Sequence, residues 1–145
     1  MNIFRGFPLD RRPRPRQIGA DRNPEPFQIF SFLKPAPRLS AAEAVARVKA
    51  GTLTLIDVRD GAEIAATGRA AGALHVPLAA LRMKCDPASP ECLPELSTDR
   101  AVALYCASGA RSQMAARMLA AMGYREVHNI GGLHHWRAAG GAVTR

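Results

Sequence analysis

Short apolar runs separated by segments of helical pattern constrain the fold of this 145-residue chain more than any other feature. The runs cover residues 53–58, 73–76, 101–105 and, more weakly, 127–130. Runs that are nearly continuous rather than alternating are typical of strands buried on both faces of a parallel sheet. Helical patterns lie between and after them, at residues 61–66, 78–82, 112–122 and 133–138. We therefore expect an α/β domain around a mainly parallel sheet, with right-handed crossovers.

The first element of this domain is a helix whose start and end are both marked. Ser40 and Glu43 have the spacing of a capping box, in which each side chain accepts a backbone N–H from the other residue. Gly51 follows the helical stripe and suits the left-handed conformation in which many helices end. These signals place the start of the domain at Leu39.

Residues 1–38 differ from the rest of the chain in composition. They hold eight lysines and arginines against three acidic residues, so five of the eight net positive charges lie there. Frequent prolines oppose helix formation, and little apolar area is available to offset the ordering of the chain. We expect a basic, Pro-rich tail over residues 1–38, largely extended or disordered, and one domain over residues 39–145. A solvated leader is favoured over a tail that binds an acidic partner or nucleic acid.

Three cysteines, Cys85, Cys92 and Cys106, are too few for a disulfide framework and favour a reducing compartment. No apolar run reaches the roughly 20 residues that a membrane span needs. The apolar residues near the N-terminus are interrupted early by Pro8 and Asp10, which does not fit the core of a signal peptide. The sequence therefore predicts a cytoplasmic protein with no membrane partner, and the Arg-rich, acid-poor N-terminus leaves import into an organelle as the alternative.

One strand-to-helix turn contains the residues best suited to catalysis. The buried strand 101–105 leads directly into Cys106, and a helix follows from Ser112. Backbone N–H groups at such a turn favour negative charge, which predicts a lowered thiol pKa and a reactive thiolate. Gly109 permits the backbone to curl around the sulfur, and Arg111 offers a permanent charge for an anion. The alternatives are an inert packed cysteine and an arginine that is merely solvated at the helix start.

At this point the sequence resembles the rhodanese family. The resemblance extends over about residues 39–140, and it rests on Leu55 to Arg59, Glu63, Gly68, Pro77-Leu78, Tyr105 to Ser112, Ala115-Ala116, Leu119, Gly123-Tyr124, Val127, Gly131-Gly132 and Trp136. It implies a five-stranded parallel sheet sandwiched between helices. It also implies that Cys106 is the catalytic nucleophile, and that the residues after it bind the substrate: Ala107, Ser108, Gly109, Ala110, Arg111 and Ser112.

The implied activity is that of a thiosulfate:cyanide sulfurtransferase-like enzyme. A Cys106 persulfide would carry a sulfane sulfur from thiosulfate or another persulfide donor to a thiol, cyanide or protein-dithiol acceptor, with no metal and no cofactor. Ala107 and Ser108 differ from the basic loop residues of the thiosulfate-preferring members. In place of the family's His-Ile-Pro-Gly run this chain has Arg69 to Gly72.

Two other functions stay open. Phosphatases and arsenate reductases with a related fold have five residues between the cysteine and the arginine, whereas four lie between Cys106 and Arg111, a ring better suited to one sulfur atom. A binding or regulatory module without catalysis is the second alternative, although inactive members commonly lack the cysteine. The presence of Cys106 therefore favours the enzyme.

Several other polar residues receive structural interpretations. Asp57, Arg59 and Glu63 are expected to form an ion pair near the active turn, of the weak surface kind. His75 is expected to be a hydrogen-bonded histidine of the core. Cys85 and Cys92 can be a redox-sensitive disulfide, resolving thiols for a Cys106 persulfide, or ordinary surface residues, and their spacing does not match a zinc knuckle.

Overall fold

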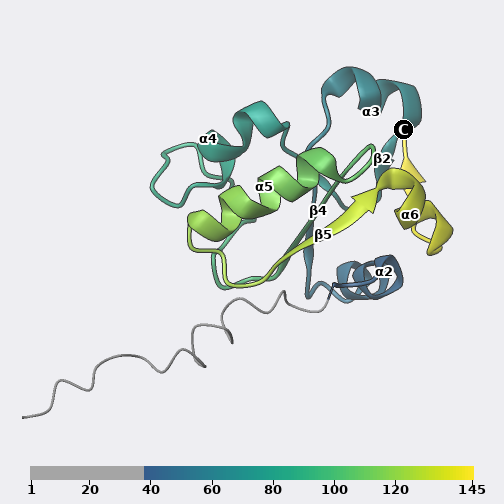
Figure 1. Cartoon of the computed structure of the whole chain (residues 1–145), viewed down its shortest axis with the longest axis horizontal. Helices are drawn as coiled ribbons and strands as arrows, with labels where there is room; N and C mark the ends of the chain where they lie inside the picture. The colour runs from purple at the N-terminus through teal and green to yellow at the C-terminus, as the bar shows by residue number, and fades with distance from the viewer. Residues whose placement is uncertain (1–37) are drawn as a thin grey trace, which may run out of the picture. The chain divides into compact units, whose positions relative to one another are not determined.

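The computed structural model describes residues 38–145, so the predicted tail, apart from Arg38, lies outside the described residues. The elements are α2 (Ala41–Lys49), β1 (Thr54–Asp57), α3 (Gly61–Thr67), β2 (Arg69–Ala70), β3 (Leu74–His75), η1 (Leu78–Ala80), α4 (Leu81–Cys85), β4 (Val102–Cys106), α5 (Ala110–Ala121), β5 (Val127–Gly132), α6 (Leu133–Ala138) and β6 (Val143–Thr144) (Figure 1). All four predicted strands and the predicted helices are present within a few residues of their expected bounds. None of the helices over residues 38–145 has the length and apolar character that a membrane crossing requires.

The main sheet has four parallel strands in the order β3-β1-β4-β5. The expectation of five strands in this sheet is therefore wrong for the part of the chain that the structure describes. The two other strands, β2 and β6, pair with each other in a separate antiparallel ladder, with Ala70 opposite Val143. The short β2 thus forms its backbone hydrogen bonds with β6 and does not extend the parallel sheet.

Helices cover both faces of the sheet, and β4 shows the alternation most clearly. Val102, Leu104 and Cys106 face one apolar cluster, which includes side chains of α4 and α5. Ala103 and Tyr105 face the other cluster, which includes side chains of α2 and α6. All five residues of β4 are buried, as the continuous apolar run predicted. The strand therefore delivers Cys106 into the layer between the sheet and α5.

Two capping boxes fix the starts of helices in this fold. The predicted box at α2 is confirmed, because the Ser40 hydroxyl accepts the Glu43 N–H at 3.1 Å and the Glu43 carboxylate accepts the Ser40 N–H at 2.9 Å. The same arrangement occurs at α3, where Asp60 Oδ1 accepts the Glu63 N–H at 2.9 Å and Glu63 Oε2 accepts the Asp60 N–H at 3.1 Å. The second box holds the Glu63 carboxylate in one place, which matters for the site below.

Candidate active site

Cys106 ends β4 at the carboxyl edge of the sheet, and its loop folds back over it. The side chain is fully buried, whereas Ala107 and Ser108 are exposed. Gly109 has a φ of 105°, which side-chain-bearing residues adopt only with strain, and this lets the Gly109 N–H reach Cys106 Sγ at 2.9 Å. The loop therefore closes as a ring around the sulfur before α5 begins at Ala110.

The loop makes the Cys106 thiol acidic. Burial raises its pKa, but hydrogen bonds from the Ser112 hydroxyl and from the backbone N–H groups of Ser112, Gly109 and Ser108 outweigh burial and lower the pKa to about 7. Hydrogen-bond donors that converge on one sulfur stabilise the charged thiolate more than the neutral thiol, which lowers the pKa. The lowered pKa that the turn predicted is thus present, with backbone donors as a main cause.

Asn129 of β5 completes the site, and the sequence reading missed it. Its Nδ2 donates to the Gly109 carbonyl at 2.9 Å, and its Oδ1 accepts from the Ser112 hydroxyl at 2.7 Å and from the Gly131 N–H at 2.9 Å. The Ser112 hydroxyl lies 3.5 Å from Cys106 Sγ and has one proton, so the shorter contact to Asn129 competes with the sulfur. A polar amide between Val127 and Ile130 of the predicted strand was the signal that could have found this residue.

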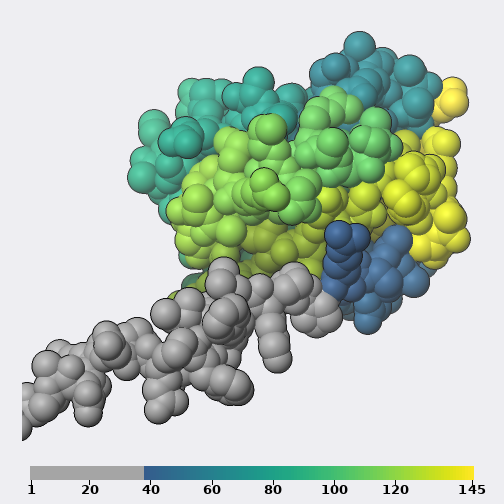
Figure 2. Space-filling view, viewed as in Figure 1, coloured from purple at the N-terminus to yellow at the C-terminus, as the bar shows by residue number. Residues whose placement is uncertain are grey.

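Arg111 forms a two-pronged ion pair with Glu63. Its Nη1 and Nη2 lie 2.7 Å from Oε2 and Oε1 of the carboxylate, and both side chains are about one-third exposed. The Arg111 hydrogen bonds lower the pKa of Glu63 to about 2, and the carboxylate raises the pKa of Arg111. In the space-filling view the first turn of α5 meets α3 at the surface (Figure 2). The prediction that grouped Glu63 with Asp57 and Arg59 is therefore wrong, because Glu63 faces the reactive loop.

Asp57 and Arg59 do pair, but in the core rather than at the surface. Arg59 Nη2 lies 2.7 Å from Asp57 Oδ2, with the two side chains 3% and 0% exposed. Tyr105 donates its hydroxyl to the same carboxylate oxygen at 2.6 Å and accepts the Ala70 N–H. His75 Nε2 lies 2.8 Å from the Arg59 carbonyl, as expected of a hydrogen-bonded histidine. This network fixes the carboxyl ends of β1 and β4, and with them the start of the reactive loop.

Of the six predicted substrate-binding residues, Ser112 alone has a side chain within hydrogen-bonding distance of Cys106 Sγ. Ala107, Ser108 and Ala110 are exposed, and of these three only Ser108 acts on the thiol, through its backbone N–H. The loop also lies hard against the end of β5. A Cβ on Gly132 would collide with the Ala107 carbonyl oxygen, and a Cβ on Gly109 would lie 3.3 Å from Gly131 Cα. The close approach fixes the direction of the loop.

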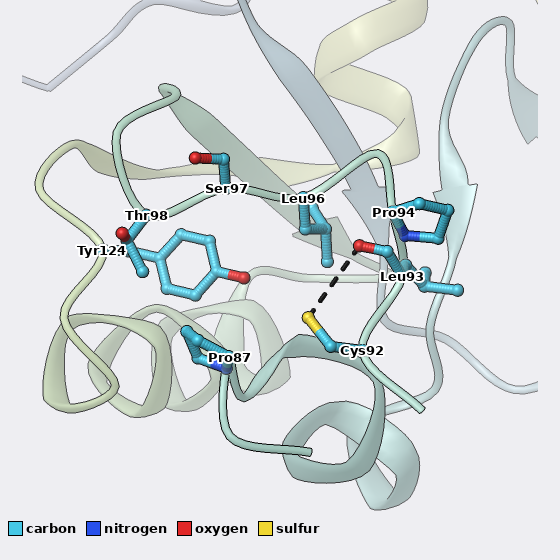
Figure 3. Close-up of a pocket in the computed structure, with 8 residues that line it drawn as sticks. All are labelled: Pro87, Cys92, Leu93, Pro94, Leu96, Ser97, Thr98 and Tyr124. Carbon is cyan, nitrogen blue, oxygen red and sulfur yellow. Dashed lines mark hydrogen bonds between the residues drawn. The ribbon is translucent and has the colours of Figure 1, made fainter. Parts of the chain in front are cut away.

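The other two cysteines lie away from this edge. Cys92 lines a pocket of about 380 Å³ with Pro87, Leu96, Ser97, Thr98 and Tyr124 (Figure 3). Residues 96–98 lead into the start of β4, whereas Cys106 ends that strand, so a five-residue strand of roughly 16 Å separates the two levels. All three cysteines are free thiols. This placement does not bring Cys92 to the sulfur as a resolving thiol.

Residues 40–139 match the model of the rhodanese-like domain. The chain belongs to the rhodanese-like family. A sulfurtransferase from Allochromatium vinosum is 37% identical over 87 residues, which span 59% of this chain and 73% of that protein. A transcriptional regulator of the helix-turn-helix type from Mycobacterium tuberculosis is 37% identical over 73% of this chain, but this match spans only 44% of the regulator. The rhodanese-like domain thus occurs in relatives of different overall length.

Two solved structures are similar to this chain in fold and in sequence. A Rhodopseudomonas palustris protein of unknown function, described as a possible tyrosine phosphatase, aligns at 35% identity with a TM-score of 0.66, over 74% of this chain and 83% of its own. The human single-domain sulfurtransferase aligns at 26% identity with a TM-score of 0.60, over 72% of this chain and 97% of its own. The family and the two relatives named as sulfurtransferases support a sulfurtransferase in general terms.

Proposed function

We propose that this chain is a sulfurtransferase that carries a sulfane sulfur as a persulfide on Cys106. The observation that carries the proposal is a buried cysteine whose sulfur accepts the Gly109 N–H at 2.9 Å and whose pKa is lowered to about 7. A thiol of this acidity is substantially thiolate at neutral pH, and the thiolate is the nucleophile. The matched family and the Allochromatium vinosum relative support the same class of reaction.

In the first step the Cys106 thiolate attacks the outer sulfur of the donor. A bond forms between Cys106 Sγ and that sulfur, the bond between the donor's two sulfurs breaks, and the electron pair leaves with the donor. Thiosulfate leaves sulfite, and an organic persulfide leaves a thiolate. Cys106 lies buried at the base of its loop, so we infer that the donor approaches past the exposed Ala107 and Ser108.

In the second step a thiophilic acceptor removes the sulfur. A thiol, cyanide or a protein dithiol attacks the outer sulfur of the persulfide, and Cys106 leaves as a thiolate. The backbone N–H groups of Ser108, Gly109 and Ser112 stabilise the negative sulfur in both states, and the fixed loop keeps their reorganisation small. The donor and acceptor are small molecules or protein thiols of a reducing compartment, which agrees with the proposed cytoplasmic location.

Sulfur loading is the direct test. The full chain is incubated with thiosulfate or with glutathione persulfide, and the intact mass and its site are measured. We expect the mass of one sulfur atom to be added at Cys106, and no addition in Cys106→Ser. Cys92→Ser is the matched control, and it should load as the parent does. A parent chain that never retains sulfur at Cys106 would overturn the proposal and leave a binding module as the better account.

An aryl phosphatase is the rival to exclude, since the Rhodopseudomonas palustris neighbour is described as a possible tyrosine phosphatase. Four residues separate Cys106 from Arg111. The Arg111 fork is also occupied by Glu63, so it does not present both ends to a tetrahedral oxyanion. We expect no measurable hydrolysis of p-nitrophenyl phosphate under conditions in which Cys106 loads sulfur.

A further inference from the structure

The positive charge of Arg111, next to the reactive loop, is neutralised by Glu63, and this affects which sulfur donor the site favours. Arg111 is the first charged side chain after Cys106, since Ala107, Ser108, Gly109 and Ala110 carry none. Both ends of its guanidinium are bound at 2.7 Å by the Glu63 carboxylate. Glu63 keeps its negative charge at neutral pH, because the pKa is about 2. An anion that approaches the loop therefore meets backbone N–H dipoles but almost no net charge.

Glu63 does not depend on Arg111 for its position. Its Oε2 also accepts the Asp60 N–H at 3.1 Å, and its own N–H donates to Asp60 Oδ1 at 2.9 Å in the capping box of α3. The Asp60 carboxylate adds a second negative charge near Arg111. A helix start thus holds two carboxylates beside the end of the loop, and their position is set by α3 and not by the arginine.

Donors of sulfane sulfur differ in charge. Thiosulfate is a dianion, and its leaving group, sulfite, is also a dianion. The persulfide group of an organic persulfide carries one negative charge, and its leaving group is a thiolate. The attraction of a donor to a free positive charge grows with the negative charge of the donor, and a compensated ion pair removes that attraction. A free arginine would favour the dianion by bidentate pairing, but Glu63 already occupies the fork. The dianion therefore loses more than the monoanion from this arrangement.

We propose that Glu63 is a specificity-determining residue that directs the Cys106 site toward organic persulfide donors and against thiosulfate. The inference rests on the proposed sulfur transfer and adds the class of donor. In the transfer step the Cys106 thiolate bonds to the outer sulfur of the persulfide, the sulfur–sulfur bond of the donor breaks, and the organic thiolate leaves. No oxidant or reductant is needed, because the sulfane sulfur keeps its oxidation state.

The test compares kcat/KM for thiosulfate and for 2-hydroxyethyl persulfide, whose persulfide group is its only charge, in the full chain at pH 8 with one acceptor. The parent should prefer the persulfide. Glu63→Gln keeps the size of the side chain and an acceptor for Asp60 N–H, but it frees the charge of Arg111. We expect the ratio of thiosulfate to persulfide kcat/KM to rise about fivefold, the size of effect that a partly exposed ion pair can give.

Ionic strength supplies a readout that a damaged fold would not produce. In Glu63→Gln the attraction of a dianion to a free arginine is screened by salt, so thiosulfate kcat/KM should fall as salt rises. The parent, with its compensated pair, should show a flat dependence. Glu126→Gln is the matched control, since Glu126 also pairs with an arginine, Arg47, at 2.7 Å but precedes β5 at the other end of the strands. It should change neither the ratio nor the salt dependence.

A second variant leaves the ion pair intact and tests the same idea. Ala107→Lys adds one uncompensated positive charge to an exposed loop position and should also raise the thiosulfate ratio. The inference is overturned if the parent uses thiosulfate as well as the persulfide, or if neither variant shifts the ratio while Cys106 still loads sulfur. Failure of every donor to load Cys106 would instead overturn the proposed function.

Discussion

The carboxyl end of α4 and the carboxyl end of β4 each hold a fully buried thiol, and the two differ in acidity. Cys85 and Cys106 both belong to the apolar cluster between the sheet and α4 and α5. Burial raises the pKa of Cys85 to about 12, with a further increase from Cys92 nearby. Burial raises the pKa of Cys106 as well, but there the loop donors reverse the effect and lower it to about 7.

The comparison separates burial from the direction of the local dipoles. At Cys85 the helix ends, so its last carbonyl groups are the near dipoles and offer no N–H to the sulfur. At Cys106 a helix is about to begin, and its free N–H groups converge on the sulfur. The same residue in the same core is thus a weakly acidic thiol at one helix terminus and an acidic thiol at the other.

Differential alkylation gives the largest expected contrast. At pH 7 about half of Cys106 is thiolate, whereas roughly one part in 10⁵ of Cys85 is, so we expect iodoacetamide to react with Cys106 at least about 1,000-fold faster. Mass spectrometry of timed digests measures both rates in one sample. Similar rates at the two sites would remove the distinction between the two thiols.

Gly109→Ala should weaken the donor at the centre of the comparison. A side chain at a φ of 105° is strained, and the new Cβ would lie 3.3 Å from Gly131 Cα, so the Gly109 N–H turns away from the sulfur. We expect a higher Cys106 pKa, about tenfold slower alkylation at pH 7 and a loss of stability of about 1–3 kcal/mol.

Gly123→Ala is the control for backbone strain. Its φ is 98° and no atom would lie within 4 Å of the new Cβ, so it should lose similar stability in urea unfolding. The alkylation rate of Cys106 should stay at the parent value. A drop in that rate in Gly123→Ala would show that loss of stability alone explains the result at Gly109.

Stability should depend on pH with opposite signs at the two thiols. The folded pKa of Cys106 is lowered, so its contribution is present above the unfolded thiol pKa of about 8.5 and is lost as pH falls through 7, a change of up to about 2 kcal/mol. The folded pKa of Cys85 is raised, so its contribution is present below pH 8.5 and is lost as pH rises toward 12. Urea midpoints of the parent, Cys106→Ser and Cys85→Ala between pH 6 and 10 measure both slopes.

Ser112→Ala is expected to have a smaller effect on the Cys106 thiol. The hydroxyl lies 3.5 Å from Sγ but 2.7 Å from Asn129 Oδ1, so it helps the thiolate only part of the time. We expect the pKa to rise and alkylation at pH 7 to slow by about two- to threefold, within the worth of one weak hydrogen bond. Ser97→Ala, at the other end of β4, should leave the rate unchanged.

Removing the Arg111 and Glu63 charges together should give the smallest effect. The double substitution Arg111→Gln with Glu63→Gln takes away a compensated pair, and the hydrogen bonds from the Ser112 hydroxyl and the backbone N–H groups of the loop remain to stabilise the thiolate. We expect less than about a twofold change in Cys106 alkylation at pH 7. A change larger than that of Ser112→Ala would mean that side-chain charge, and not the turn, sets the acidity of Cys106.

Local sequence signals were sufficient for the elements and for the reactive turn. The continuous apolar run before Cys106, the capping pattern at Ser40 and the glycine at position 109 each determine backbone conformation within a few residues. The expectation of a fifth strand came from resemblance, and it failed because β2 and β6 lie far apart in the chain and pair with each other.

Long-range partners could not be read in the same way. Glu63 is four residues from Arg59 and 48 from Arg111, and sequence proximity favoured the wrong arginine. Arg59 is instead bound by Asp57 in the core, where strand pairing brings Tyr105 to the same carboxylate. Asn129 reaches the loop because β5 pairs with β4, a register that no local pattern encodes.

Helix α5 begins without a capping side chain of its own: Gly109 occupies the N-cap position, and its amide donates to the sulfur of Cys106. The Cys106 sulfur therefore accepts a hydrogen bond from the residue at which α5 begins. In the proposed cycle, that hydrogen bond changes each time a sulfur is added to Cys106 or removed from it. We therefore expect the amide proton chemical shifts of the first turn of α5 to differ between the protein without added sulfur and the protein that carries a sulfur on Cys106.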